Sequence, residues 1–127
     1  MKLKNKVALI TGGGYGIGRE IALRFAAEGA RISIATRGIE KLEDTAKEIE
    51  AEGGQVFVIP VDISCEEDVA SMVAQTVDHF GALDILVNNA AAEGPTLPIH
   101  EMDGKDWRQV VDVNLNGLFY CTKSAGV

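Results

Sequence analysis

The chain has 127 residues, of which 46% are hydrophobic and 24% charged, so it can form one domain with a buried core and has the composition of a soluble globular protein. Its formal net charge of −7 argues against nucleic-acid binding, because basic patches hold a phosphate backbone and the sequence shows none. No apolar run approaches the roughly 20 residues of a membrane helix, and residues 7–10 are too few for the apolar core of a signal peptide, so we expect a cytoplasmic protein with no membrane partner.

The two cysteines, Cys65 and Cys121, stand far apart in the sequence. Their spacing matches neither a metal-binding motif nor a disulfide framework. We therefore expect two reduced thiols and no metal site.

The first part of the chain alternates strand patterns with helix patterns. Residues 7–10 are a continuous apolar run, as expected of a strand buried on both faces. A helical recurrence of apolar residues begins at Gly16 and stops at Gly29, and residues 32–35 form a second apolar strand. A second helix follows and ends at Gly53. Its apolar positions are Ile39, Leu42, Ala46 and Ile49.

The same alternation continues toward residue 127. Residues 56–59 predict a third strand, and Ser64 and Glu67 then fit a capping box in which each side chain bonds the other's backbone amide. The helix that they open is followed by a fourth apolar strand over residues 83–87. A glycine- and proline-containing loop leads to a last helix that begins near Asp106.

Strands that alternate with helices through short connections predict right-handed crossovers and a parallel sheet. We predict an α/β fold, the first half of a Rossmann-type doubly wound parallel sheet with strand order 3-2-1-4 and flanking helices, as one domain over residues 1–127. In such sheets ligands bind beyond the carboxyl ends of the strands, where the strand order reverses. That point lies between the first and fourth strands, so the residues after positions 10 and 87 matter most.

A glycine-rich turn follows the first strand. Five glycines lie among residues 12–18, in the pattern T-G-x-x-x-G-x-G rather than G-x-G-x-x-G. Gly12 permits a tight turn, whereas Gly16 and Gly18 let helix and sheet approach closely and leave helix amides free for a pyrophosphate. The absence of a following Gly-Lys-Ser or Gly-Lys-Thr excludes a Walker loop.

Two other interpretations of this turn stay open. It can be an ordinary tight turn between strand and helix, or the turn of an S-adenosylmethionine-dependent methyltransferase. Methyltransferases usually place a carboxylate at the end of the second strand to hold ribose hydroxyls, and this chain has Thr36 and Arg37 there.

Four motifs together resemble the short-chain dehydrogenase/reductase family. They are the glycine turn, a Val-Asp-Ile-Ser segment after the third strand, Asn-Asn-Ala-Ala after the fourth strand where the family has N-N-A-G, and an asparagine in the last helix. The resemblance covers the whole chain, which matches about the first half of a family member. It implies a cofactor site made by Gly12, Gly14, Tyr15, Gly16, Ile17, Gly18, Arg37, Asp62, Ile63, Asn89 and Ala90.

Asn114 is the catalytic residue that the resemblance implies, as the holder of a water that links a lysine to solvent. The residues alone predict that it is buried, because it falls in the apolar helical stripe of Trp107, Val110, Val111, Leu115, Leu118 and Phe119. A buried amide must find hydrogen-bond partners, so a structural role is also open. Likewise, Asp62 can be a solvated acid, and Asn88 and Asn89 can be simple turn formers.

The family's proton-transfer residues do not occur in these 127 residues. The family uses a tyrosine, a lysine four residues later that lowers the tyrosine pKa, and an upstream serine. Tyr15 is followed four residues later by Arg19, and Tyr120 precedes Lys123 by three residues only. We therefore expect that the chain is a truncated or partial form of a longer protein, inactive alone, and a naturally short nucleotide-binding module is the alternative.

The sequence predicts an oxidoreductase that transfers a hydride between NADP(H) or NAD(H) and a small-molecule carbonyl/alcohol substrate. NADP is the expected cofactor, with NAD possible, because Arg37 stands where a carboxylate would otherwise hold the adenosine ribose. A catalytically silent dinucleotide-binding module is the alternative function. The family resemblance implies a homodimer or homotetramer for the full-length protein.

Overall fold

A parallel four-stranded sheet forms the centre of the computed structural model, which describes residues 1–126. The strand order is β3-β2-β1-β4, which confirms the predicted order and fold class. The elements in chain order are β1 (Val7–Thr11), α1 (Gly16–Ala27), β2 (Arg31–Thr36), α2 (Ile39–Ala51), β3 (Val56–Pro60), α3 (Glu66–Phe80), β4 (Ile85–Val87), the short 3₁₀ turn η1 (Ile99–Glu101), α4 (Gly104–Val111), the π-helical segment η2 (Asp112–Gly117) and α5 (Leu118–Ala125).

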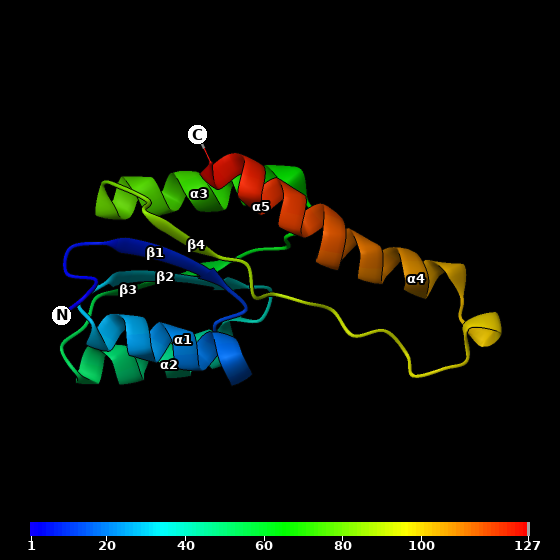
Figure 1. Ribbon diagram of the computed structural model, residues 1–127, viewed down its shortest axis with the longest axis horizontal. Helices are drawn as coiled ribbons and strands as arrows, with labels where there is room; N and C mark the ends of the chain where they lie inside the picture. Colours follow the sequence, from blue (N-terminus) through cyan, green and yellow to red (C-terminus); the bar gives the residue numbers. More distant parts are fainter. Residues whose placement is uncertain (127) are drawn as a thin grey trace.

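Helices cover both faces of the sheet (Figure 1). The side chains of β1 alternate between two cores: Ala8 and Ile10 pack with residues of α1 and α2, whereas Leu9 packs with residues of α3 and α5. All five residues of β1 are buried, as the apolar run predicts. Because the strands are parallel, the loops that follow their carboxyl ends lie at one edge of the sheet.

The beginning of α3 differs from the sequence prediction. The helix begins at Glu66 after Cys65, and no side chain caps its first amides. Ser64 instead donates both its amide and its hydroxyl to the Asp62 carboxylate, at 3.0 and 2.6 Å. The predicted capping box is therefore wrong, because a carboxylate two residues upstream competes successfully for the serine hydroxyl.

The fourth strand is shorter than predicted. It pairs with β1 over Ile85–Val87 only, and its residues are half-buried rather than fully buried. The Asp84 carboxylate accepts a hydrogen bond of 2.9 Å from the amide of Val7, so this position anchors the entry to the strand rather than extending its apolar core.

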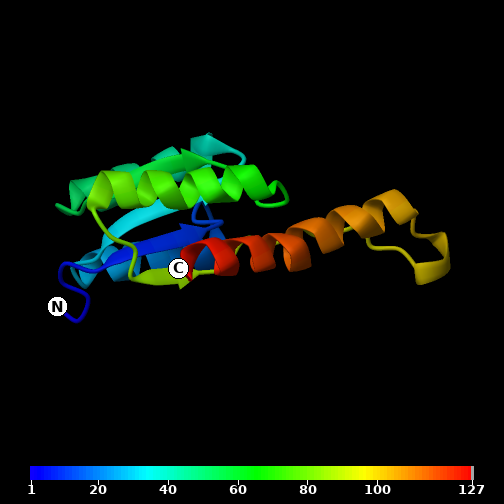
Figure 2. The ribbon, with the colours of Figure 1, turned by 90° about the horizontal axis from the view of Figure 1, so that it is seen from above.

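The last three helical segments form one long helix that projects beyond the sheet (Figures 1 and 2). Its buried positions are Val113, Gly117 and Cys121, and a Cβ on Gly117 would meet the Ile63 side chain at 2.8 Å. The predicted buried stripe is wrong, since its largest members are exposed. They are Trp107, Leu115, Leu118 and Phe119.

Both cysteines are free thiols. Cys121 is fully buried, and this burial raises its pKa to about 11. Among residues 1–126, no three His, Cys, Asp or Glu side chains converge on a possible metal position, and no helix combines the length and the apolar character needed to cross a bilayer.

Candidate cofactor site

Three adjoining pockets lie beyond the carboxyl ends of the strands, with volumes of about 410, 280 and 490 Å³. Tyr15 and Thr36 line all three, so the pockets form one continuous depression along this edge of the sheet. Every residue predicted to touch the cofactor lines at least one of them, except Gly18. The structure therefore brings the predicted residues together at the place where the strand order reverses.

The glycine turn joins β1 to α1 through two left-handed residues. Gly12 has a φ of +73° and Gly16 a φ of +58°, a region that side chains with a Cβ adopt only at a cost. Gly18 permits close packing, because a Cβ there would overlap the carbonyl oxygen of Gly12 and the side-chain nitrogen of Asn89. The prediction that Gly16 also serves close packing is wrong, since a Cβ on Gly16 would meet nothing within 4 Å.

The first turn of α1 is open to an anion. Tyr15 precedes the helix in extended conformation, no side chain caps the helix amides, and the first turn holds no acidic residue. Backbone N–H groups at a helix N-terminus, together with the positive end of the helix dipole, favour a negative group at this position.

Hydrogen bonds tie this turn to the loop that follows β4. The Thr11 hydroxyl oxygen accepts from the amides of Asn89 and Ala90 at 3.1 and 3.0 Å, and the Asn89 side chain donates to the Gly12 carbonyl at 3.0 Å. These bonds fix the turn after β1 against the loop after β4 at the place where the strand order reverses. Asn89 is thus more than a turn former, because its side chain fixes the backbone of the glycine turn.

Two threonines hold this turn: Thr11, the T of the T-G-x-x-x-G-x-G pattern, to which sequence reasoning assigned no role of its own, and Thr45, which the sequence did not indicate. Thr11 is buried at the end of β1, and Thr45 on α2 donates to the Gly13 carbonyl at 3.1 Å across 32 positions of sequence. A threonine that ends a buried apolar run is a usable sequence signal for the first. The second has none, because its role depends on how α2 packs against the turn.

Asp62 and Arg37 form the part of the site beyond β2 and β3. Both line the 280 Å³ pocket, together with Ile63 and Ala90. The hydrogen bond from the Ser64 side chain, with smaller contributions from the Ser64 amide and the Arg37 charge, holds the pKa of Asp62 below its usual value. Asp62 is consequently an ionised acceptor at neutral pH, already engaged by Ser64.

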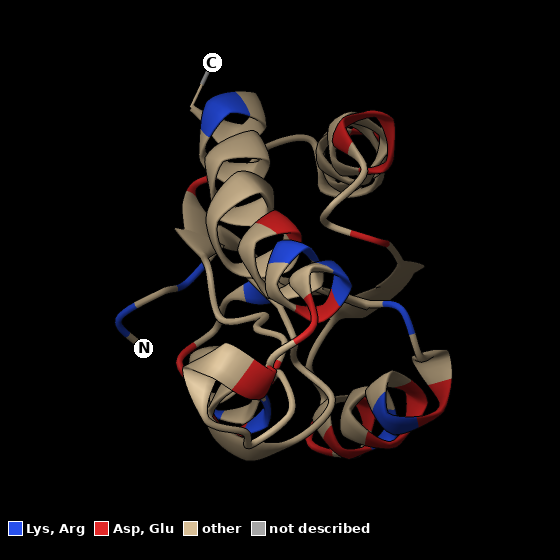
Figure 3. Cartoon of the chain, turned by 90° about the vertical axis from the view of Figure 1, so that its right-hand side faces the viewer, with Lys and Arg blue, Asp and Glu red and all other residues tan. Residues whose placement is uncertain are grey.

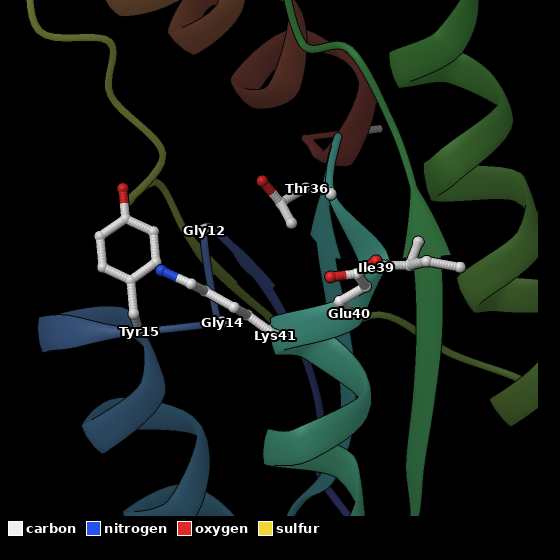
Figure 4. Close-up of a pocket in the computed structure, with 8 residues that line it drawn as sticks. Gly12, Gly14, Tyr15, Thr36, Ile39, Glu40 and Lys41 are labelled. Atoms are coloured by element: carbon white, nitrogen blue, oxygen red, sulfur yellow. The ribbon is translucent and has the colours of Figure 1, made fainter.

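The pocket beside Thr36 contains side chains that the sequence did not predict. Glu40 and Lys41, from the first turn of α2, line it with Gly14 and Tyr15 (Figure 4). Positions 36 and 37 carry no carboxylate. Glu40, four residues after Thr36, lines the same pocket as Thr36 and supplies a carboxylate there.

Asn114 lines none of the three pockets and is bonded to the loop after β4. It is half-buried, its side-chain oxygen accepts from the Ala92 amide at 2.7 Å, and its side-chain nitrogen donates to the Ala92 carbonyl at 3.0 Å. Asn88 likewise donates to the Thr122 hydroxyl on α5 at 3.2 Å. Both asparagines hold the loop after β4 against the long helix.

The two tyrosines occupy different environments. Tyr15 is exposed at the mouth of the pockets, with the Lys41 ammonium 4.7 Å from its ring centroid. Tyr120 is half-buried on α5, and Lys123 on the same helix pairs with Glu66 at 3.2 Å. Lys123 is therefore engaged with α3.

Comparisons with known proteins agree with this geometry. The family model described as "short chain dehydrogenase" matches residues 6–126. The chain is 42% identical over 124 residues to the (2S)-[(R)-hydroxy(phenyl)methyl]succinyl-CoA dehydrogenase subunit BbsD of Thauera aromatica, with 98% of this chain and 50% of that protein covered. The chain thus spans about half the length of this curated relative.

Solved structures of similar fold include complexes with either nicotinamide dinucleotide. A metagenomic short-chain oxidoreductase in complex with NADP superposes with a TM-score of 0.94 at 31% identity, covering 99% of this chain and 57% of that one. An NAD⁺-bound xylitol dehydrogenase gives a TM-score of 0.95 at 33% identity, covering 98% and 48%. The family model matches nearly all of the residues, and the superpositions agree with it. The chain belongs to the short-chain dehydrogenase family.

Proposed function

We propose that the protein is an oxidoreductase that transfers a hydride between NADP(H) and a small-molecule carbonyl/alcohol substrate in the cytoplasm. Residues 1–127 serve as its dinucleotide-binding domain, and the tyrosine, lysine and serine of proton transfer come from outside these residues. Two observations together carry the proposal: the N-terminus of α1 is uncapped, and Asn89 and Ala90 of the loop after β4 are hydrogen-bonded to Gly12 and Thr11 of the turn that leads into this helix.

Different parts of the site hold different parts of the dinucleotide in this proposal. The amides of Gly16, Ile17 and Gly18 bind the pyrophosphate, and Asp62 and Ile63 contact the adenine end. The loop of Asn89 and Ala90, supported by Asn114, flanks the nicotinamide half. The bound cofactor supplies the hydride, while these residues fix its position and orientation.

Arg37 selects NADP in this proposal. Its guanidinium is exposed at the adenosine end of the site, and a charge-assisted bond to the 2′-phosphate contributes roughly 1.5–3 kcal/mol, or about ten- to a hundredfold in affinity. NAD, which lacks this phosphate, gains nothing from the arginine.

Binding measurements test both points. We expect the product of the full reading frame to bind NADPH more tightly than NADH, and Arg37→Ala to lose about tenfold in NADPH affinity while NADH affinity is unchanged. Arg108→Ala, an exposed arginine on α4, is the matched control. Equal wild-type affinities, or equal losses for both cofactors in Arg37→Ala, would contradict the assignment.

The family match rules out the methyltransferase interpretation of the glycine turn, so a catalytically silent dinucleotide-binding module is the second candidate. A catalytically silent module would bind NADPH without oxidising it in the presence of any ketone, and is distinguished by turnover of the full-length protein against a ketone panel.

A further inference from the structure

Lys41 lies closer to the glycine turn than its place in the sequence suggests. It belongs to the first turn of α2, and its ammonium lies 4.7 Å from the centroid of the Tyr15 ring (Figure 4). Both side chains line the pocket beside Thr36. The Lys41 ammonium and Arg37 therefore both lie along the continuous depression formed by the three pockets.

The stem of Lys41 is fixed against the turn. A Cβ on Gly14 would come within 2.9 Å of the Lys41 Cβ, so only a glycine at position 14 allows this approach without a shift. One turn further along α2, the Thr45 hydroxyl contacts both the Lys41 carbonyl, at 3.3 Å, and the Gly13 carbonyl, at 3.1 Å. These contacts hold the start of α2 and the glycine turn as one unit.

We propose that Lys41 is a second cofactor-selecting cation, which binds the phosphate on the adenosine ribose of NADP together with Arg37. This inference rests on the proposed nicotinamide cofactor. Tyr15 acts as a positioning residue, because a cation over an aromatic face is held there by the negative ring quadrupole. A phosphate dianion offers three acceptor oxygens, so two cations from different elements can bind it at once.

The charge pattern of α2 sets Lys41 apart. The helix carries mostly acidic charges (Figure 3). Its other lysine is Lys47. The acidic positions are Glu40, Glu43, Asp44, Glu48 and Glu50. Of these, Glu40 lines the same pocket and works against a phosphate there, so Lys41 and Arg37 must outweigh one carboxylate.

Cofactor titration of the full-length protein tests the role of the lysine. Lys41→Met keeps the stem and removes the charge, and we expect its dissociation constant for NADPH to rise about tenfold with NADH affinity unchanged. Lys47→Met, an exposed lysine on the same helix, should leave both constants within twofold of wild type. Glu40→Gln should tighten NADPH binding by a few-fold, because it removes the opposing charge.

Tyr15 variants separate positioning from folding. Tyr15→Leu should weaken NADPH binding about two- to fivefold through loss of the ring, whereas Tyr15→Phe, which keeps the ring, should restore the wild-type ratio of the two dissociation constants. A structural role alone would change the affinities for both cofactors equally in the leucine variant.

The possible outcomes distinguish this inference from the proposed function. If Arg37→Ala loses affinity for NADPH but not for NADH, while Lys41→Met binds both cofactors as the wild type does, the lysine assignment is overturned and the proposed function stands. If the wild type binds neither dinucleotide, the proposed function itself fails. If the wild type prefers NADH and Glu40→Gln loses NADH affinity, the pocket holds a ribose hydroxyl through Glu40 and the phosphate assignment is overturned.

Discussion

Two glycines of the cofactor turn should respond differently to the same substitution. Gly18→Ala places a methyl group against the Gly12 carbonyl and the Asn89 side chain, so we expect a loss of about 1–3 kcal/mol of stability and more than tenfold weaker NADPH binding. In Gly16→Ala the added methyl group meets no atom within 4 Å. Only the left-handed φ opposes this substitution, so we expect a loss of about 1–2 kcal/mol of stability.

Urea unfolding and NADPH titration measure this contrast. Gly53→Ala is the matched control, since Gly53 also has a positive φ and an added Cβ would meet nothing within 4 Å, but it follows the C-terminal end of α2. It should lose stability as Gly16→Ala does and bind NADPH as the wild type does. A Gly18→Ala protein with wild-type affinity would show that the close approach at this glycine does not shape the site.

At the residue scale, the sequence predicted those site residues that lie just after a strand. Gly12 follows β1 directly and Asn89 lies two residues after β4, and parallel strands bring their carboxyl ends to one edge. Thr45 and Lys41 could not be predicted, because their roles depend on contacts between α2 and the glycine turn that no periodicity records. Glu40 was missed for the same reason.

At the element scale, Asn114 should act by holding the loop after β4. Asn114→Ala leaves the amide and the carbonyl of Ala92 without their partner, so we expect about 1–2 kcal/mol of destabilisation and about tenfold faster hydrogen exchange at the Ala92 amide. Asn116→Ala is the control: its side chain bonds Asp112 on the exposed surface of the same segment, and it should leave this exchange rate unchanged. Equal exchange in both variants would contradict the assigned contact.

The sequence predicted the burial of an element correctly where helices cover both of its faces. The apolar runs of β1 and β2 predicted buried strands correctly, because helices lie on both sides of them. The last helix was predicted on the wrong face, because hydrophobicity was equated with burial. Its buried side is made by Val113, Gly117 and Cys121, where a small residue permits close approach to Ile63.

At the scale of the whole molecule, two apolar features invite association. Trp107, Leu115, Leu118 and Phe119 are exposed on the long helix, and β4 has β1 as its one strand neighbour within residues 1–126. Large exposed apolar patches and unpaired strand edges both favour pairing with another chain. We therefore propose that the protein is a homo-oligomer, and expect residues 1–127 expressed alone to self-associate and to lack NADPH turnover.

Light scattering over a concentration series checks this expectation. The double variant Leu118→Lys and Phe119→Lys should reduce the apparent mass, whereas Val77→Lys, at an isolated exposed apolar residue of α3, should not. A dispersed wild-type monomer at every concentration would refute the association, and turnover by residues 1–127 would place the proton-transfer groups within them.

The π-helical segment η2 has a consequence for which changes the long helix can tolerate. Each α-helical residue advances the chain by about 100° around the axis, so one inserted or deleted residue in Asp112–Gly117 would turn all of α5 by that angle. Cys121 would leave the core and Thr122 would lose Asn88. Exposed Asn116 can vary in identity, but the length of the segment cannot change. The length of η2 therefore fixes which side of α5 faces the loop after β4.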